Sequence, residues 1–101
     1  MDKTKHADFI FCIGYEGATA LVDGKMKAQY GSYSTLQLAE AGLFRPACAS
    51  ALSSENPEEI KAFIEFYNKK TGSAITTPEE LSKLFGVSIE DFSGKTVRIL
   101  K

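Results

Sequence analysis

The stretch Asp8–Tyr30, DFIFCIGYEGATALVDGKMKAQY, decides the fold that the sequence predicts. It contains a largely apolar run at 8–13, a second apolar run at 18–22 and an alternating run at 25–30. The first run is apolar on both faces, which is typical of a central strand covered on each side. The third run alternates lysine or glutamine with apolar residues, as a half-exposed strand does. The segment therefore predicts a three-stranded antiparallel meander.

Two turns would separate these strands. Gly14-Tyr15-Glu16-Gly17 has glycines three positions apart, and glycine adopts positive φ without steric cost. Asp23-Gly24 is typical of a two-residue type I′ turn, which needs positive φ at both central residues. The first of these segments lacks the third glycine of a dinucleotide fingerprint and the Gly-Lys-Ser/Thr end of a P-loop. We therefore expect a β-turn there rather than a phosphate site.

Helices are predicted over most of the chain that follows. Each has a cap residue or a proline at its start; they cover 35–41, 46–52, 57 to Gly72 and 78 to Gly86. Ser88–Phe92 adds at most one further turn. Lys95–Lys101 is predicted to be a last strand, which should join the sheet because a lone strand leaves its backbone groups unpaired.

These elements predict a single α+β domain over residues 1–101, with 1–7 as a frayed tail. We expect a small antiparallel sheet of about four strands, the N-terminal meander plus the C-terminal strand. Three to four helices would pack mainly on one face. A chain of 101 residues suits one hydrophobic core and is too short for two ordinary domains.

The charge balance limits the class of partner. Twelve basic and 13 acidic residues give a net charge of −1, whereas non-specific nucleic-acid binding needs a surplus of Lys and Arg. The N-terminal segment is charged, and the short apolar run after it is too brief for a signal-peptide core or a membrane span. We therefore expect no nucleic-acid partner, no membrane partner and a cytoplasmic location.

Catalytic and metal-binding residue types are sparse. Cys12 and Cys48 lie in apolar surroundings, where two buried free thiols are expected and a Cys12–Cys48 disulfide is the alternative. Cys48 is the better nucleophile candidate, because it follows Pro46 near a helix start and lies three residues after Arg45; it has no evident base partner. His6 is the single histidine and lies in the charged tail. We predict no catalytic residue, no metal site and no cofactor.

Six residues form the candidate binding surface, since aromatic and arginine side chains in or beside loops are common in binding patches. They are Tyr15, Glu16, Tyr30, Tyr33, Phe44 and Arg45. In an up-down-up meander, the first turn and the end of the third strand lie at the same end of the sheet. Tyr15 would then lie near Tyr30 and Tyr33, in a pocket or a partner surface. The alternative is that these aromatic rings close the rim of the core.

Three functions follow from these observations. The leading hypothesis is a small non-enzymatic protein-interaction or regulatory module that self-associates. The first alternative is a small-molecule-binding domain or minor enzyme. Its pocket would lie near Tyr15, Glu16, Tyr33 and Arg45. The second alternative is DNA binding through 78–92, where a helix, a glycine turn and a serine-capped segment resemble a helix-turn-helix; Glu90 and Asp91 there would repel phosphates.

Overall fold

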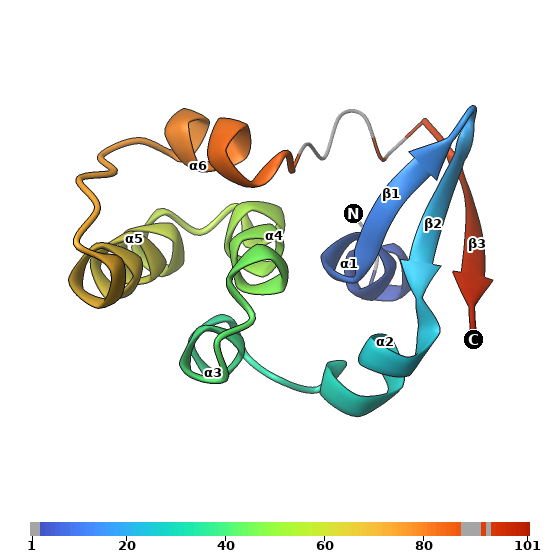
Figure 1. Cartoon of the computed structure of the whole chain (residues 1–101), viewed down its shortest axis with the longest axis horizontal. Helices are drawn as coiled ribbons and strands as arrows, with labels where there is room; N and C mark the ends of the chain where they lie inside the picture. The colour runs from blue at the N-terminus through green and yellow to red at the C-terminus, as the bar shows by residue number, and fades with distance from the viewer. Residues whose placement is uncertain (1–2, 88–91, 93) are drawn as a thin grey trace.

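The computed structural model describes residues 3–87, 92 and 94–101, and for residues 3–6 it describes the backbone alone. The elements follow one another as α1 (Lys3–Ile10), β1 (Cys12–Glu16), β2 (Thr19–Asp23), α2 (Gly24–Tyr30), α3 (Thr35–Glu40), α4 (Phe44–Ser54), α5 (Pro57–Thr71), α6 (Pro78–Phe85) and β3 (Thr96–Leu100). The described residues thus form an α+β fold with a three-stranded sheet and six helices (Figure 1). This confirms the predicted class, with more helices than expected.

The sheet is mixed, not wholly antiparallel. Its strand order is β1-β2-β3; β1 pairs antiparallel with β2, and β3 pairs parallel with β2 from Thr19↔Thr96 to Asp23↔Leu100. The prediction that the C-terminal strand joins the sheet is confirmed. The prediction of about four antiparallel strands is matched only in part, because the sheet has three strands and only β1 and β2 are antiparallel. A parallel neighbour requires a crossover connection, and here helices α2–α6 lie between β2 and β3.

The start of the chain differs from the prediction. The expected strand at 8–13 is divided, because α1 continues to Ile10 and β1 begins at Cys12. The range 3–7, expected to be frayed, lies within α1. The consecutive side chains from Phe9 to Cys12 are all buried, and a continuous apolar run of this kind has no period that separates helix from strand. The turn comes at Gly17, with φ +60°, whereas Gly14 and Tyr15 lie within β1.

Asp23-Gly24 does not form the predicted hairpin, and 25–30 is not a strand. Asp23 is instead the N-cap of α2, where its Oδ1 accepts hydrogen bonds from the backbone N–H groups of Lys25 and Met26, both at 3.1 Å. An aspartate oxygen at this position satisfies helix donors that would otherwise be unpaired. The residues that follow are mostly good helix formers, so the alternating pattern at 25–30 was misleading.

The helices predicted from their caps are confirmed. Ser34 and Gln37 form the capping box of α3, Asn56 caps α5, and Thr77 caps α6. The helix expected at 46–52 is longer at both ends, because α4 covers Phe44–Ser54. The further turn expected within Ser88–Phe92 falls mainly on residues 88–91, outside the described residues.

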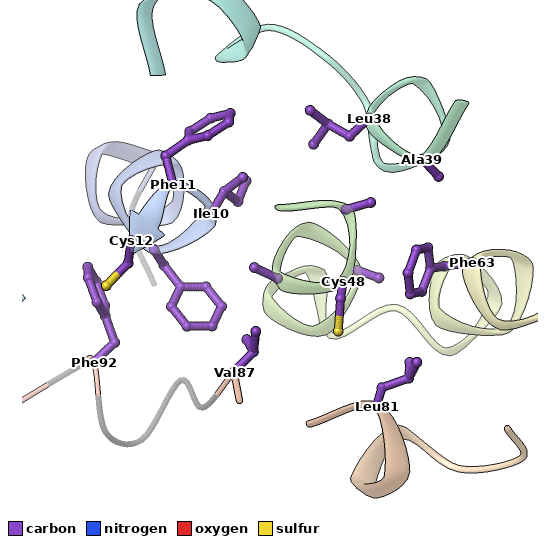
Figure 2. Packing of buried hydrophobic residues seen from close by; sticks show 14 of the residues in the cluster. Ile10, Phe11, Cys12, Leu38, Ala39, Cys48, Phe63, Leu81, Val87 and Phe92 are labelled. Carbon is purple, nitrogen blue, oxygen red and sulfur yellow. The ribbon is translucent and has the colours of Figure 1, made fainter. Parts of the chain in front are cut away.

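Helix α4 lies at the centre of the molecule and packs against α1, α3, α5 and α6 (Figure 1). Its small side chains Ala47, Cys48 and Ala51 have no exposed surface, so neighbouring elements can approach it closely. Figure 2 shows Cys48 of α4 facing Phe63 of α5 and Leu81 of α6. The buried residues form one continuous core, and the radius of gyration of 12.9 Å matches the value of about 13 Å expected for a compact domain of 100 residues.

Candidate functional site

Arg45, one of the six predicted binding residues, donates hydrogen bonds to two other parts of the chain. It lies in the first turn of α4 and is half-buried. Its Nε donates to the carbonyl oxygen of Phe85 at 3.1 Å, and its Nη1 donates to the carbonyl oxygen of Cys12 at 2.6 Å. The guanidinium therefore joins α4 to the start of β1 and to the end of α6. A cation held between two backbone carbonyls primarily fixes how these elements pack.

Tyr15 and Arg45 are two of the six predicted residues that lie close together. Both line a small cavity between β1 and the start of α4, together with Phe9, Ile10, Cys12, Ala49, Gly86 and Val87. Its volume is about 10 Å³, close to the minimum of roughly 10–15 Å³ that one water molecule needs. The Tyr15 ring also receives the Lys95 ammonium at 5.2 Å from its centroid. Glu16 is exposed at the end of β1 and does not line this cavity.

Arg45 also lines a larger cleft. Its volume is about 260 Å³, and its lining is mainly apolar: Ile10, Phe11, Cys12, Ile13, Asp23, Met26, Arg45 and Pro46. Ile13 is 55% exposed, which makes it an accessible apolar contact at this cleft. The Asp23 carboxylate is already engaged with the N-terminus of α2. Arg45 likewise donates to the backbone carbonyls of Phe85 and Cys12, so both polar side chains of the lining hold hydrogen bonds within the fold and the cleft is mainly apolar.

Tyr30 and Tyr33 form a separate aromatic pair. Their rings meet edge to face, with centroids 5.0 Å apart, and the Tyr33 N–H donates to the Tyr30 carbonyl at 3.0 Å. The pair lies at the end of α2, which Figure 1 places at the bottom of the view, whereas β1 ends at the top. Because 24–30 is helical, the meander geometry that would have brought Tyr15 to this pair does not exist. The six predicted residues thus do not form one site.

Phe44 belongs to the core rim. Its ring meets that of Tyr67 edge to face at 5.3 Å, and Tyr67 in turn meets Phe85 at 5.4 Å. These rings connect α4, α5 and α6, and Tyr67 also lies beside the buried ring of Phe63. Phe44 therefore closes the rim of the core, which was the alternative to a place in a binding surface.

The two thiols are free and buried. Burial raises the pKa of Cys48 to about 12, and the positive charge of Arg45 lowers it by a smaller amount. At neutral pH Cys48 is therefore a protonated thiol. Since the thiolate is the nucleophilic form, Cys48 is not activated, despite its place near the start of α4.

A polar cluster that was not predicted lies between three helices. Thr35 of α3 is buried; its Oγ1 lies 2.7 Å from Ser50 Oγ of α4 and donates to Glu59 Oε1 of α5 at 2.8 Å. Because a hydroxyl has one proton to donate, Ser50 is the donor in the first of these bonds. None of these three residues lines the cavities beside Arg45. The cluster satisfies buried polar groups and holds α3, α4 and α5 in register.

A groove along α5 was not predicted either. Its volume is about 570 Å³, and it is lined by Pro57, Ile60, Lys61, Ile64, Glu65, Asn68, Ile75, Thr76 and Pro78. Ile60 and Ile64 pack against the core on the same helix as Phe63. Phe63 is fully buried, but Ile60 and Ile64 are only half-buried and contribute to the groove wall.

Asn68 shapes this groove. Its Nδ2 donates to the carbonyl of Ile75 at 2.8 Å, and its Oδ1 accepts from the Ile75 N–H at 3.0 Å. One amide side chain thus pairs with both backbone groups of Ile75, as a neighbouring strand would. The segment after α5 is fastened to the helix, and the groove is present before anything binds.

Within residues 3–87, 92 and 94–101, no group of three or more His, Cys, Asp or Glu residues is arranged to hold a metal ion. The His6 side chain and residues 88–91, which include most of the second half of the possible helix-turn-helix, lie outside the described residues. No helix in the described part of the chain combines the length and apolar character needed to cross a bilayer.

Comparisons with known proteins found no match to a family model, to a curated protein or to a solved structure. The function is therefore argued from the chain's own residues.

Proposed function

We propose that this chain is a small non-enzymatic protein-interaction module that self-associates. The observation that carries this proposal is the groove of about 570 Å³ on α5, with isoleucine and proline walls and charged side chains among its lining residues. Grooves that combine apolar walls with charged lining residues are typical of protein contact surfaces. The hydrogen bonds from Asn68 to Ile75 hold its second wall in place, which lowers the entropy lost on binding.

The nucleophile candidates support an interaction role over catalysis. The Cys48 thiol is protonated at neutral pH, and the hydroxyls of Thr35 and Ser50 are engaged in the buried cluster with Glu59. A binding role needs none of these groups to react.

Sedimentation velocity or light scattering across a wide range of protein concentrations tests the proposal. We expect the average mass of the wild type to rise towards that of a dimer as concentration increases. Ile64→Asn should reduce this rise, because it places an amide in the groove wall. Ile13→Asn is the matched control, since Ile13 is an exposed isoleucine on β1, away from α5. A wild-type mass that stays at the monomer value would contradict the proposal.

The cleft beside Arg45 favours a second candidate function, the binding of a small apolar molecule. Its 260 Å³ volume and the exposed Ile13 side chain support this alternative. A ligand that binds the folded form raises its melting temperature, so a thermal-shift screen against small metabolites tests it. A true hit should lose its effect in Met26→Ser, which changes the cleft wall, and should keep it in Ile64→Asn.

A further inference from the structure

Lys61 and Glu65 place opposite charges side by side on the outer face of α5. Both are exposed, both line the groove, and both flank Ile64 in the sequence and on the helix. In the described part of the chain neither makes an ion pair, and the pair found there joins Lys27 to Asp8. These two charges are therefore free to meet groups on another molecule.

The order of the two charges matters. A glutamate four residues before a lysine pairs better within a helix than the reverse order. Here Lys61 comes first and Glu65 second, so the intrahelical pair is the weaker arrangement. Their pairing within the helix accordingly does little to compete with an external partner.

The positions of Lys61 and Glu65 on α5 allow each to face the other's counterpart in a second copy related by a two-fold axis. Residues 61 and 65 lie about 6 Å apart along the helix, at 1.5 Å per residue. If a second α5 lies antiparallel against the first, with the axis at the level of residue 63, Lys61 of each copy comes level with Glu65 of the other. Ile60 and Ile64 also lie near that axis, so apolar contact and charge pairing coincide. In such an isologous contact each pair occurs twice.

We propose that the groove on α5 is occupied by a second copy of this chain, with the two α5 helices antiparallel and Lys61 of each copy paired with Glu65 of the other. The proposal rests on the self-association proposed above and names the surface and the register. The four charges would alternate in sign around the axis, above the contact between the Ile64 side chains and the wall formed by Ile75.

Charge reversal gives a direct test by sedimentation velocity. Lys61→Glu makes all four charges at the contact negative, and Glu65→Lys makes all four positive. Each variant alone should associate about tenfold more weakly than the wild type or worse, since like charges facing each other at an interface cost a kcal/mol or more. An equimolar mixture of the two should associate again, because the negative α5 of one variant then faces the positive α5 of the other.

The mixture also controls for damage to the fold, because two unfolded variants could not restore association in each other. Lys25→Glu provides a charge-matched control, since Lys25 is exposed on α2 and should leave association unchanged. If the wild type dimerises but both reversals dimerise equally well, the α5 register is wrong and the self-association stands. If the reversals weaken association but their mixture does not recover it, the antiparallel pairing is wrong. A monomeric wild type would overturn both proposals.

Discussion

Cys48 lies in the core with no exposed surface, and its surroundings determine its chemistry. Burial disfavours the charged thiolate more than Arg45 favours it, so the pKa rises from 9.0 to about 12. The folded protein therefore keeps the proton at pH values where the unfolded chain has lost it. Stability from this group is fully present below pH 9 and is lost as pH rises towards 12.

We predict that wild-type stability falls between pH 9 and pH 11 more steeply than that of Cys48→Ala. This thiol adds up to about 1.4 kcal/mol per pH unit to the fall in the free energy of unfolding, at pH values where the folded and unfolded states differ by one bound proton. Urea unfolding at a series of pH values measures the difference in slope. Equal slopes for the two proteins would show that the thiol titrates normally. In the same preparations, the native thiol should resist alkylation at pH 8 until the protein is unfolded.

Thr35 is the central member of the buried hydroxyl cluster, because it bonds to both Ser50 and Glu59. Thr35→Val keeps the shape but removes the hydroxyl, which leaves two polar groups without their partner. We predict a loss of about 1–3 kcal/mol in the free energy of unfolding, measured in urea. Thr71→Val on α5 is the control, since Thr71 is exposed, and it should change stability by less than half as much.

The segment from Asp23 to Tyr30 shows how one pattern can support two elements. Asp-Gly favours a hairpin, but Asp also favours the N-cap of a helix. The helix forms here because Asp23 ends β2 and its carboxylate meets the first free N–H groups of α2. A Cβ on Gly24 would come within 2.5 Å of the Leu100 carbonyl oxygen, so the glycine is needed for the approach of β3 rather than for positive φ.

We predict that Asp23→Ala lowers the free energy of unfolding by about 0.5–2 kcal/mol, as loss of an N-cap usually does. Asp23→Asn should recover most of this loss, because the amide oxygen can still accept from Lys25 and Met26. Chemical denaturation of the three proteins measures both effects. If alanine and asparagine destabilise equally, the cap does not contribute and the charge of Asp23 matters instead.

The whole molecule depends on contacts between segments far apart in sequence. Arg45 links α4 to Cys12 and Phe85, which are 33 and 40 residues away from it. Strand β3 completes the sheet only after the chain has passed through α2–α6 (Figure 1). Loss of Arg45 should therefore loosen the packing of β1 and α6 together.

We predict that Arg45→Met lowers the free energy of unfolding by about 2–4 kcal/mol, since hydrogen bonds from a charged group are worth about 1.5–3 kcal/mol each and methionine retains part of the packing. Arg98→Met, on exposed β3, should have a much smaller effect. Hydrogen exchange provides a second measurement, in which protection should fall at β1 and at the end of α6. Loss of protection confined to α4 would contradict the role assigned to Arg45.

Part of the fold and little of the candidate site could be predicted from the sequence. The starts of α3, α5 and α6 were correct, because Ser34, Asn56 and Thr77 act on N–H groups two or three residues away. The groove on α5 was not predicted. The apolar residues of this helix recur at one helical spacing, and that spacing does not distinguish Phe63, which is in the core, from Ile64, which lines the groove.

The sequence by itself determined the α+β class, the starts of α3, α5 and α6 and the presence of a C-terminal strand, since capping and hydrophobic periodicity are local properties. The tertiary structure alone decided that 8–10 and 24–30 are helical, that β3 runs parallel to β2, and that Ile60, Ile64 and Ile75 line one groove. These outcomes depend on which surfaces become buried against each other. Such long-range contacts override local preference wherever a segment is compatible with both helix and strand.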